Sequence, residues 1–353
     1  MNHPVLIIDK AKLRHNAEVV LKMCREANIE VCAVTKAFCA HPEIAETLIE
    51  AGINCLADSR IQNLKKLRRL PITKMLLRIP MLSEVEEVVR YAQISLNSEL
   101  KTVEALSAAA LKTGKKHGII IMIELGDLRE GILPGEAVEF AGKVLGLPGV
   151  QLLGVGVNLN CHGGIIPDRK NLGQLVSVAG EIEAEYGIRL QTISGGNSGS
   201  FYLVRDHQMP PGINQLRLGE VILLGRETSF QQKIDGLYTD VFTFQAEIVE
   251  LKEKPSVPYG EMGRDSFGLR PGFQDKGVIK RAIAACGKQD ILWNQLTPHQ
   301  QGIDLIGASS DHLLLDVTHA GRDYTVGDTV DFSLSYGALL AAFTSEYVYK
   351  YCI

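Results

Sequence analysis

Apolar runs and amphipathic stretches alternate along the first 225 residues of the chain. The runs have the length and continuous hydrophobicity of strands that are buried on both faces. They lie near 31–35, 53–57, 74–80, 92–97, 118–125, 151–159, 190–194 and 215–224. Helical patterns separate most of them, at 11–27, 43–51, 60–69, 83–91, 99–113, 135–146 and 169–187. About eight β/α units in roughly 220 residues predict a (β/α)8 barrel of the TIM type over residues 1–225.

A doubly wound parallel sheet is the alternative architecture for this alternation. It is disfavoured because no G-x-G-x-x-G motif follows the first strand.

The pattern changes after residue 225. The segments there are β-rich and broken by Gly, Pro and Asp, and they include "FTFQAEIVELKEK", "GVIKRAIAACG", "QGIDLIGASSDHLLLDVT" and "GDTVDFSLSYG". We therefore expect a separate all-β domain over residues 226–353. Whether the first strand of the chain joins the barrel or this β-domain stays open.

Composition excludes several classes of function. The net charge of -4 over 353 residues gives no electrostatic footprint for nucleic acid or for an anionic membrane. The N-terminus lacks a signal-peptide pattern, and "GIIIMIEL", one of the longest apolar runs, is too short to span a bilayer. The seven cysteines are scattered, with no C-x-x-C pair, so we expect a reducing cytoplasm and no metal centre.

Chemistry in such a barrel lies at the carboxyl ends of the strands. In "EVCAVTKAFCAHP" a single charge, Lys36, follows the apolar residues 31–34. A lysine just past a strand is usually a solvated surface charge. At the carboxyl end of a barrel strand it would instead face the active-site side, where a partly desolvated lysine can act as a Schiff-base amine.

The segment "SGGNSGS", residues 194–200, has the composition of an anion cradle. Its small residues let backbone N–H groups approach a ligand, and Asn197, Ser198 and Ser200 can add polar contacts. Gly219, at the end of the eighth strand, supplies a second turn at the place where barrels often bind phosphate. The alternative for the segment is an ordinary loop.

Arg217 lies between apolar residues and needs an anionic or polar partner, because an unpartnered buried arginine is costly. That partner is either a ligand or a structural carboxylate such as Glu220 or Asp127. Arg129 in "GDLREG" raises the same question. A lysine, a phosphate cradle and two arginines together fit pyridoxal 5'-phosphate (PLP), an aldehyde that carries a phosphate.

The chain resembles the alanine racemase family of fold-type III PLP enzymes, and within it the branch of alanine and ornithine racemases. The resemblance covers nearly the whole chain. The motifs that carry it are "AVTKAFC", "ADSRIQNLKKL", "LNSELKT", "GDLREGI", "SGGNSGS", "LRLGEVILLGRE" and "GASSDHLLLDV". It implies racemisation of an amino acid, ornithine first, with alanine, lysine, serine, arginine or a broad range of substrates as alternatives.

The resemblance also implies roles for barrel residues. Lys36 matches the lysine that holds PLP as an imine and works on one face of the substrate α-carbon. Arg129 matches an arginine at the phenolic oxygen of the cofactor, and Asn158 falls where a histidine commonly lies beside the ring. Arg217 matches the arginine that faces the pyridine nitrogen.

The phosphate contacts of the family fall on both predicted domains. Ser198 and Gly219 match contacts from the barrel, where Asn197 shares the same segment. Tyr336 in "FSLSYG" matches a tyrosine that reaches the phosphate from the β-domain. In family members of this layout the β-domain of one subunit completes the site of the other, so a head-to-tail homodimer is expected.

The sequence departs from alanine racemases at the second catalytic base. The motif that usually holds its tyrosine is replaced here by residues 287–291, Gly-Lys-Gln-Asp-Ile. Inversion needs proton removal on one face and delivery on the other, and Lys288 is the first candidate for the second face. Asp290, His312 and Cys286 are its alternatives.

Two further departures point to a larger, cationic substrate. The barrel tyrosine of the family is replaced by Ala40, and a methionine near the substrate carboxylate by Ser310, followed by Asp311. Asp311, Asp290 or Glu261 could pair with a distal ammonium. The competing hypotheses are a D-amino-acid lyase or aldolase, which the missing H-x-C pattern disfavours, and a non-catalytic PLP carrier, which the β-domain disfavours.

Overall fold

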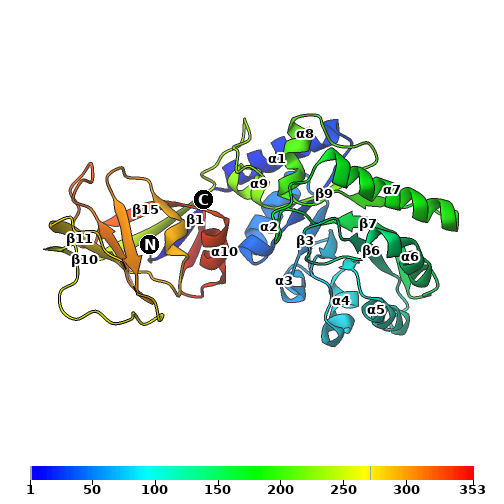
Figure 1. Cartoon of the computed structure of the whole chain (residues 1–353), viewed down its shortest axis with the longest axis horizontal. Coiled ribbons are helices and arrows are strands. Elements are labelled where there is room, and N and C mark those ends of the chain that lie inside the picture. Colours follow the sequence, from blue (N-terminus) through cyan, green and yellow to red (C-terminus); the bar gives the residue numbers. More distant parts are fainter. Residues whose placement is uncertain (1, 271) are drawn as a thin grey trace. The chain divides into compact units, whose positions relative to one another are not determined.

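The computed structural model describes residues 2–270 and 272–353. The chain forms two compact units (Figure 1). One unit comprises Lys10–Thr239, and the other comprises residues 2–9 together with Asp240–Ile353.

The larger unit is a closed barrel of eight parallel strands, which confirms the predicted (β/α)8 barrel. The strands, in order around the barrel, are β2 (Glu30–Val34), β3 (Cys55–Asp58), β4 (Thr73–Leu76), β5 (Ile94–Asn97), β6 (His117–Ile123), β7 (Val150–Val157), β8 (Thr192–Ser194) and β9 (Gln215–Leu218). Pairing of β2 with β9 closes the barrel, with Glu30 opposite Gln215 and Ala33 opposite Leu218.

Helices surround the strands (Figure 1). They are α1 (Lys10–Glu26), α2 (Pro42–Glu50), α3 (Ile61–Lys66), α4 (Val85–Tyr91), α5 (Leu100–Lys112), α6 (Ala137–Leu145), α7 (Arg169–Tyr186), α8 (Phe201–Arg205) and α9 (Glu220–Leu224). Side chains from alternate strand positions, among them Cys32, Ala57, Met75 and Met122, form the apolar cluster inside the barrel. The intervening positions pack against the helices.

The predicted strand over 215–224 is wrong in its second half. The strand ends at Leu218, Gly219 is the residue between, and α9 follows as a helix. Residues 221–224 of this helix are all buried, so their hydrophobicity is continuous. A short apolar run of this kind cannot be assigned to a strand or to a helix from its periodicity.

The smaller unit is built on an eight-stranded sheet. Its strands are β1 (Val5–Ile8), β10 (Phe242–Pro255), β11 (Val278–Ala284), β12 (Leu296–Pro298), β13 (Asp304–Ala308), β14 (Leu313–Asp316), β15 (Thr329–Leu334) and β16 (Tyr349–Cys352). All pairings are antiparallel except that of β1 with β16. One helix, α10 (Tyr336–Thr344), follows β15. The first strand of the chain thus belongs to the β-domain.

The boundary between the units lies later than the predicted 225/226. Residues 226–239 pack on the barrel unit through backbone hydrogen bonds, in which Ile234 N donates to Gly225 O at 2.9 Å. The buried Asn16 on α1 donates to Tyr238 O and accepts from Tyr238 N, both at 2.8 Å. This segment has no regular secondary structure to mark it as part of the barrel, so the pattern alone placed the boundary too early.

Among the residues described, no helix is both long and apolar enough to cross a bilayer.

Close approach of β7 to β8 requires glycine at position 154, and this predicts a specific sensitivity. A Cβ atom on Gly154 would lie 1.8 Å from Thr192 O, so Gly154→Ala would force two paired strands apart. We expect a loss of at least about 2 kcal/mol in the free energy of unfolding, as for other overpacked cores. Calorimetric and denaturant unfolding of the purified variant would measure it.

Gly180, in the interior of α7, is the matched control. A Cβ there meets nothing within 4 Å, so Gly180→Ala should stabilise the protein by about 1 kcal/mol through helix propensity. Equal stability of Gly154→Ala and the parent would contradict the close approach.

Candidate active site

Lys36 lies two residues beyond the carboxyl end of the first barrel strand, β2, with Thr35 between them. It begins a 3-10 turn, Lys36–Phe38, whose backbone is held by Thr35 O, the acceptor for the N–H groups of Phe38 and Ala40. Cys39 and Ala40 both have positive φ angles, of 49° and 52°. Such left-handed geometry is unusual for non-glycine residues and clusters at functional sites. The half-buried Lys36 therefore lies in a tightly defined turn.

Two carboxyl groups, the buried Asp58 and the half-buried Glu220, act on Lys36 electrostatically. Burial raises the pKa of Asp58, at the end of β3, although hydrogen bonds and the charge of Lys36 oppose the rise. Burial also raises the pKa of Glu220, at the start of α9, to about 7, and the charges of Arg226 and Lys36 oppose this shift. The lysine thus lies among acidic groups that water solvates poorly.

The "SGGNSGS" segment and the start of α9 meet at Ser198. The Ser198 hydroxyl is buried and accepts from the N–H groups of Gly219 at 3.3 Å and of Val221 at 3.2 Å. Gly219 is confined, because a Cβ there would lie 3.2 Å from Val34 Cβ. Backbone donors from Gly219, which follows β9, and from Val221 of α9 therefore converge on a serine that follows β8. Converging backbone N–H groups suit an anion.

Asn197 holds the shape of this cradle. Its side chain accepts from Gly199 N at 2.7 Å and donates to Leu159 O at 2.8 Å. The Asn158 amide lies between Asn197 and Arg129. Its oxygen accepts from Asn197 Nδ2 at 3.2 Å or, with the amide flipped, from Arg129 Nη2 and Nη1 at 3.2 and 3.3 Å.

Arg129 forms an ion pair with the adjacent Glu130 and also contacts the sulfur of Cys161 at 2.5 Å. Sequence reasoning missed both partners. Neighbouring residues in a loop carry no spacing signal, and Cys161 lies on a different strand-end loop. The structure thus brings Arg129 near Asn158, with the Asn158 amide flipped, and adds the Glu130 carboxylate beside Arg129.

Arg217 lies inside the barrel opposite Cys32 of β2 and is only 3 % exposed. Its guanidinium donates to Ser194 Oγ at 2.6 Å and to Val157 O at 2.7 Å. Neither Glu220 nor Asp127, the two candidate structural carboxylates, forms an ion pair with Arg217. Asp127 instead accepts from backbone N–H groups, the nearest at 2.9 Å. Burial lowers the pKa of Arg217 to about 10, so the guanidinium stays charged at neutral pH.

The β-domain candidates gather where two turns meet. Gly287 has no room for a side chain, because a Cβ would lie 2.3 Å from Asp311 N and Ser310 O. Next to it, Lys288 donates its backbone N–H to Ser309 O at 2.9 Å. The Lys288 ammonium lies 3.6 Å from the centre of the Phe267 ring and 3.9 Å from Asp265. The structure therefore brings Lys288, Ser310 and Asp311 together.

The other candidates of this domain differ in availability. Asp290 is buried and accepts from Gly287 N at 2.9 Å and from Ser345 Oγ at 3.3 Å, so it serves the turn. Burial raises the pKa of Cys286, which keeps its thiol protonated. His312 is exposed, with Nδ1 3.0 Å from Asp311 Oδ1.

Tyr336, predicted to reach the phosphate, is the first residue of α10 and is half-buried. The helix start is fixed by Gln295, whose side-chain oxygen accepts from Ser335 Oγ at 2.5 Å. A Cβ on Gly337 would lie 2.3 Å from the same oxygen. The position of Tyr336 within the β-domain is thus well defined.

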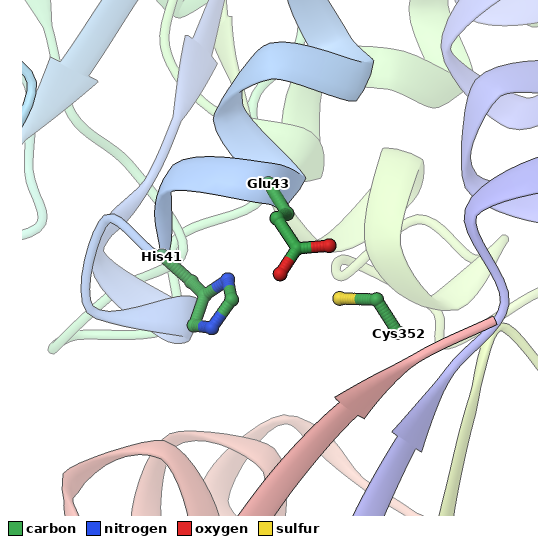
Figure 2. A group of neighbouring side chains, drawn as sticks. All are labelled: His41, Glu43 and Cys352. Carbon is green, nitrogen blue, oxygen red and sulfur yellow. The ribbon is translucent and has the colours of Figure 1, made fainter.

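Figure 2 draws three side chains of types that bind metals. His41 and Glu43 come from the start of α2, and Cys352 comes from β16. Glu43 also forms an ion pair with Lys10, whose Nζ lies 3.4 Å from Glu43 Oε2. Because Cys352 belongs to the other unit of the chain, we assign no metal centre to these residues.

Comparison with known proteins gives matches over the barrel and over the whole chain. Residues 8–227 match the family model described as "Alanine racemase, N-terminal domain". The chain is 48% identical to ornithine racemase of Acetoanaerobium sticklandii over 349 residues, 99% of each chain. It is 41% identical to lysine racemase of Thermotoga maritima, over 99% of this chain and 98% of the other.

Solved structures match in fold. Alanine racemase from Bartonella henselae, determined with covalently bound pyridoxal phosphate, superposes with a TM-score of 0.75 at 19% identity, covering 100% of both chains. The architecture of barrel plus β-domain is thus that of the fold-type III PLP enzymes. From its motifs, its fold and its full-length relatives, the chain belongs to the alanine racemase family, the PLP-dependent amino-acid racemases.

Proposed function

We propose that this chain is an ornithine racemase that interconverts the L and D enantiomers with PLP. The observation that carries the proposal is the position of Lys36 at the end of β2, beside a strand, β9, whose carboxyl end joins Ser198 in an anion cradle. The 48% identity with an ornithine racemase, which extends over 99% of each chain, supports the choice of substrate. The 41% identity with a lysine racemase makes lysine the second candidate.

The residues present fit PLP. Ser198 and the backbone N–H of Gly219 suit its phosphate, and Lys36 suits its aldehyde. Arg217 is a buried cation that donates only to neutral oxygens among the described residues, which suits a ring nitrogen acceptor. When bound, PLP supplies an electron sink for negative charge at the substrate α-carbon.

Arg217 tunes that sink through its fixed charge state. A guanidinium with a pKa of about 10 donates a hydrogen bond to a nitrogen at neutral pH but does not give up its proton. The ring would therefore remain a weaker electron sink. This favours a short-lived carbanion, which is sufficient for racemisation and limits transamination.

Inversion requires proton-transfer groups on both faces of the α-carbon. Lys36 serves one face. For the other we propose Lys288 of the β-domain, whose backbone is anchored to Ser309 beside Ser310 and Asp311. His312, held by Asp311, is the alternative, since a carboxylate-oriented imidazole is a common base.

A cationic substrate side chain would find its counter-charge at Asp311. This carboxylate is exposed, and its pKa is lowered by hydrogen bonds from His312 and Ser309, so it is ionised at neutral pH. Ser310, its neighbour, is assigned to the substrate carboxylate. Asp290 is left out of this assignment because Gly287 and Ser345 occupy its oxygens.

We also propose a head-to-tail homodimer in the cytoplasm. The layout of the family, in which one β-domain completes the site of the partner barrel, supports the dimer. All seven cysteines are free thiols, which suits a reducing compartment.

Incubation of the PLP-loaded protein with L-ornithine in deuterated water tests the reaction and the substrate together. We expect α-deuterated D-ornithine, formed faster than the corresponding products of L-lysine, L-alanine or L-serine, measured by chiral chromatography and mass spectrometry. Lys36→Ala should lower the rate at least about a thousandfold, because both the cofactor amine and a proton-transfer group are lost.

Exchange with retention of configuration would mean that Lys36 acts without a second base, and would remove Lys288 from the mechanism. Faster turnover of lysine than of ornithine would reassign the substrate. No exchange with any of the four amino acids would overturn the proposed function.

Ser198→Ala should weaken the binding of PLP. The loss of one buried hydroxyl from the phosphate cradle is expected to raise the dissociation constant about tenfold, the equivalent of one good hydrogen bond. Absorbance titration of the PLP-free protein measures it. Ser177→Ala, on the exposed side of α7, is the control and should bind PLP as the parent does. Parent-like affinity of Ser198→Ala would remove Ser198 from the cradle.

Asp311→Asn should lower the preference for ornithine over alanine, because a neutral amide attracts an ammonium far less than a carboxylate does. We expect the ratio of the two kcat/KM values to fall about tenfold or more. Asp290→Asn is the contrast, and should lower thermal stability while the ratio stays constant. The assignment fails if Asp311→Asn keeps the parental ratio.

A further inference from the structure

A buried hydrogen bond joins the residue before Lys36 to the end of the neighbouring strand. Thr35 Oγ1 donates to Asp58 Oδ2 at 2.5 Å, and both side chains are completely buried. The bond follows from the register of β2 and β3, in which Val34 lies opposite Ala57. Thr35 follows Val34 and Asp58 follows Ala57, so the two residues lie side by side where the strands end.

The other oxygen of Asp58 holds the loop that leads into α3. Asp58 Oδ1 accepts from Arg60 N at 2.8 Å and from Asn63 Nδ2 at 3.1 Å. Asn63 Nδ2 also lies 3.2 Å from Asp58 Oδ2, the oxygen that accepts from Thr35. Asp58 thus connects two strand-end loops, with Thr35 on Oδ2, Arg60 on Oδ1 and Asn63 on both oxygens.

Thr35 transmits this restraint to Lys36 through the backbone. Thr35 N donates to Ala57 O at 2.8 Å, and Thr35 O accepts from Phe38 and Ala40 across the lysine turn. Every polar group of Thr35 is therefore engaged, on one side with β3 and on the other with the turn. A change at Asp58 would be felt first by the peptide that carries Lys36.

Resting on the proposed function, we propose that Asp58 is a positioning residue for Lys36, holding its turn through Thr35 and placing a carboxylate near it. Asp58 lies at a strand position whose side chain packs outside the barrel interior, since the alternate residues Cys55 and Ala57 belong to the interior cluster. It therefore acts through Lys36 without contacting substrate.

The experiment follows the lysine–PLP linkage rather than turnover. Hydroxylamine displaces PLP from Lys36, and the rate of this displacement depends on the fraction of the lysine–PLP linkage that carries a proton. Absorbance gives this rate in the full-length, PLP-loaded protein as a function of pH. Ionisation of the reagent is common to all variants, so differences between the profiles report the protein.

We expect Asp58→Asn to move the midpoint of the profile about one unit toward lower pH, because an anion that stabilises the protonated linkage is removed. Displacement above the parental midpoint should then be about tenfold slower. Glu220 is the other carboxyl that acts on Lys36 and titrates near neutrality, so the shift is also measured in the Glu220→Gln background, where it should persist.

Variants at the neighbouring residues separate positioning from general stability. Thr35→Val removes the hydrogen bond from Thr35 to Asp58 and should shift the profile. Thr35→Ser keeps the hydroxyl and should give the parental profile. Asn63→Ala removes the hydrogen bonds from α3 to both Asp58 oxygens but keeps the one from Thr35, and should leave the profile unchanged. Asp316→Asn is the matched control, because Asp316 also accepts from a threonine hydroxyl and a backbone N–H but lies in the β-domain.

A parental profile in Asp58→Asn and Thr35→Val, with PLP still bound, would overturn the proposal. An equal shift of the profile in Asn63→Ala and in Asp58→Asn would mean that Asp58 serves only the loop before α3. This outcome would also overturn the proposal. Failure of the parent to hold PLP on Lys36, tested by borohydride reduction and peptide mass spectrometry, would instead overturn the proposed function.

Discussion

Closure of the barrel between β2 and β9 is the constraint on which the site depends. The two strands are far apart in the sequence, and their pairing places Ala33 opposite Leu218. Lys36 follows one strand, and Gly219 follows the other. The lysine and the start of the anion cradle are therefore neighbours only because the barrel closes in this register. A shift by one residue would also exchange interior and exterior side chains on every paired position.

The same closure leaves little room at the strand ends. The Gly219 Cα is already so near Val34 that an added methyl group would touch its Cβ. Arg217 lies inside the barrel beside Cys32, where water cannot solvate its charge. Such burial is costly in free energy and is retained where an anionic or polar ligand compensates for it. Tight packing and buried charge thus have a common origin in the geometry of the last strand.

How far the sequence predicts this structure depends on the residue. Strand β6 was predictable because all seven of its residues are buried, and a strand covered on both faces is continuously apolar. The helix at Glu220–Leu224 was not, since its buried residues have the same continuous pattern. Residues 226–239 were assigned to the wrong unit because their attachment depends on long-range hydrogen bonds such as that from Asn16.

Candidate site residues divide in a similar way. Lys36, Ser198 and Arg217 stood out because a charge or a cluster of small residues at a strand end conflicts with an ordinary core. Glu130 as the partner of Arg129 left no such signal. Nor could the sequence distinguish Asp290, whose oxygens hold a turn, from Asp311, whose carboxylate is exposed. Which polar group is already satisfied is a property of packing, and spacing alone does not encode it.

The stability of the fold does not by itself explain the carboxyl groups around Lys36. The pKa of Glu220 rises on burial from 4.5 to about 7, so ionisation of this group disfavours the folded state increasingly as the pH rises through that range. The pKa of Asp58 is also raised by burial, although Thr35, Arg60 and Asn63 donate to it. A fold selected only for stability would place neutral residues at both positions. Their presence beside the one lysine of this turn is explained if the protein needs charge of both signs where it holds an amine, an anion and a mobile proton together.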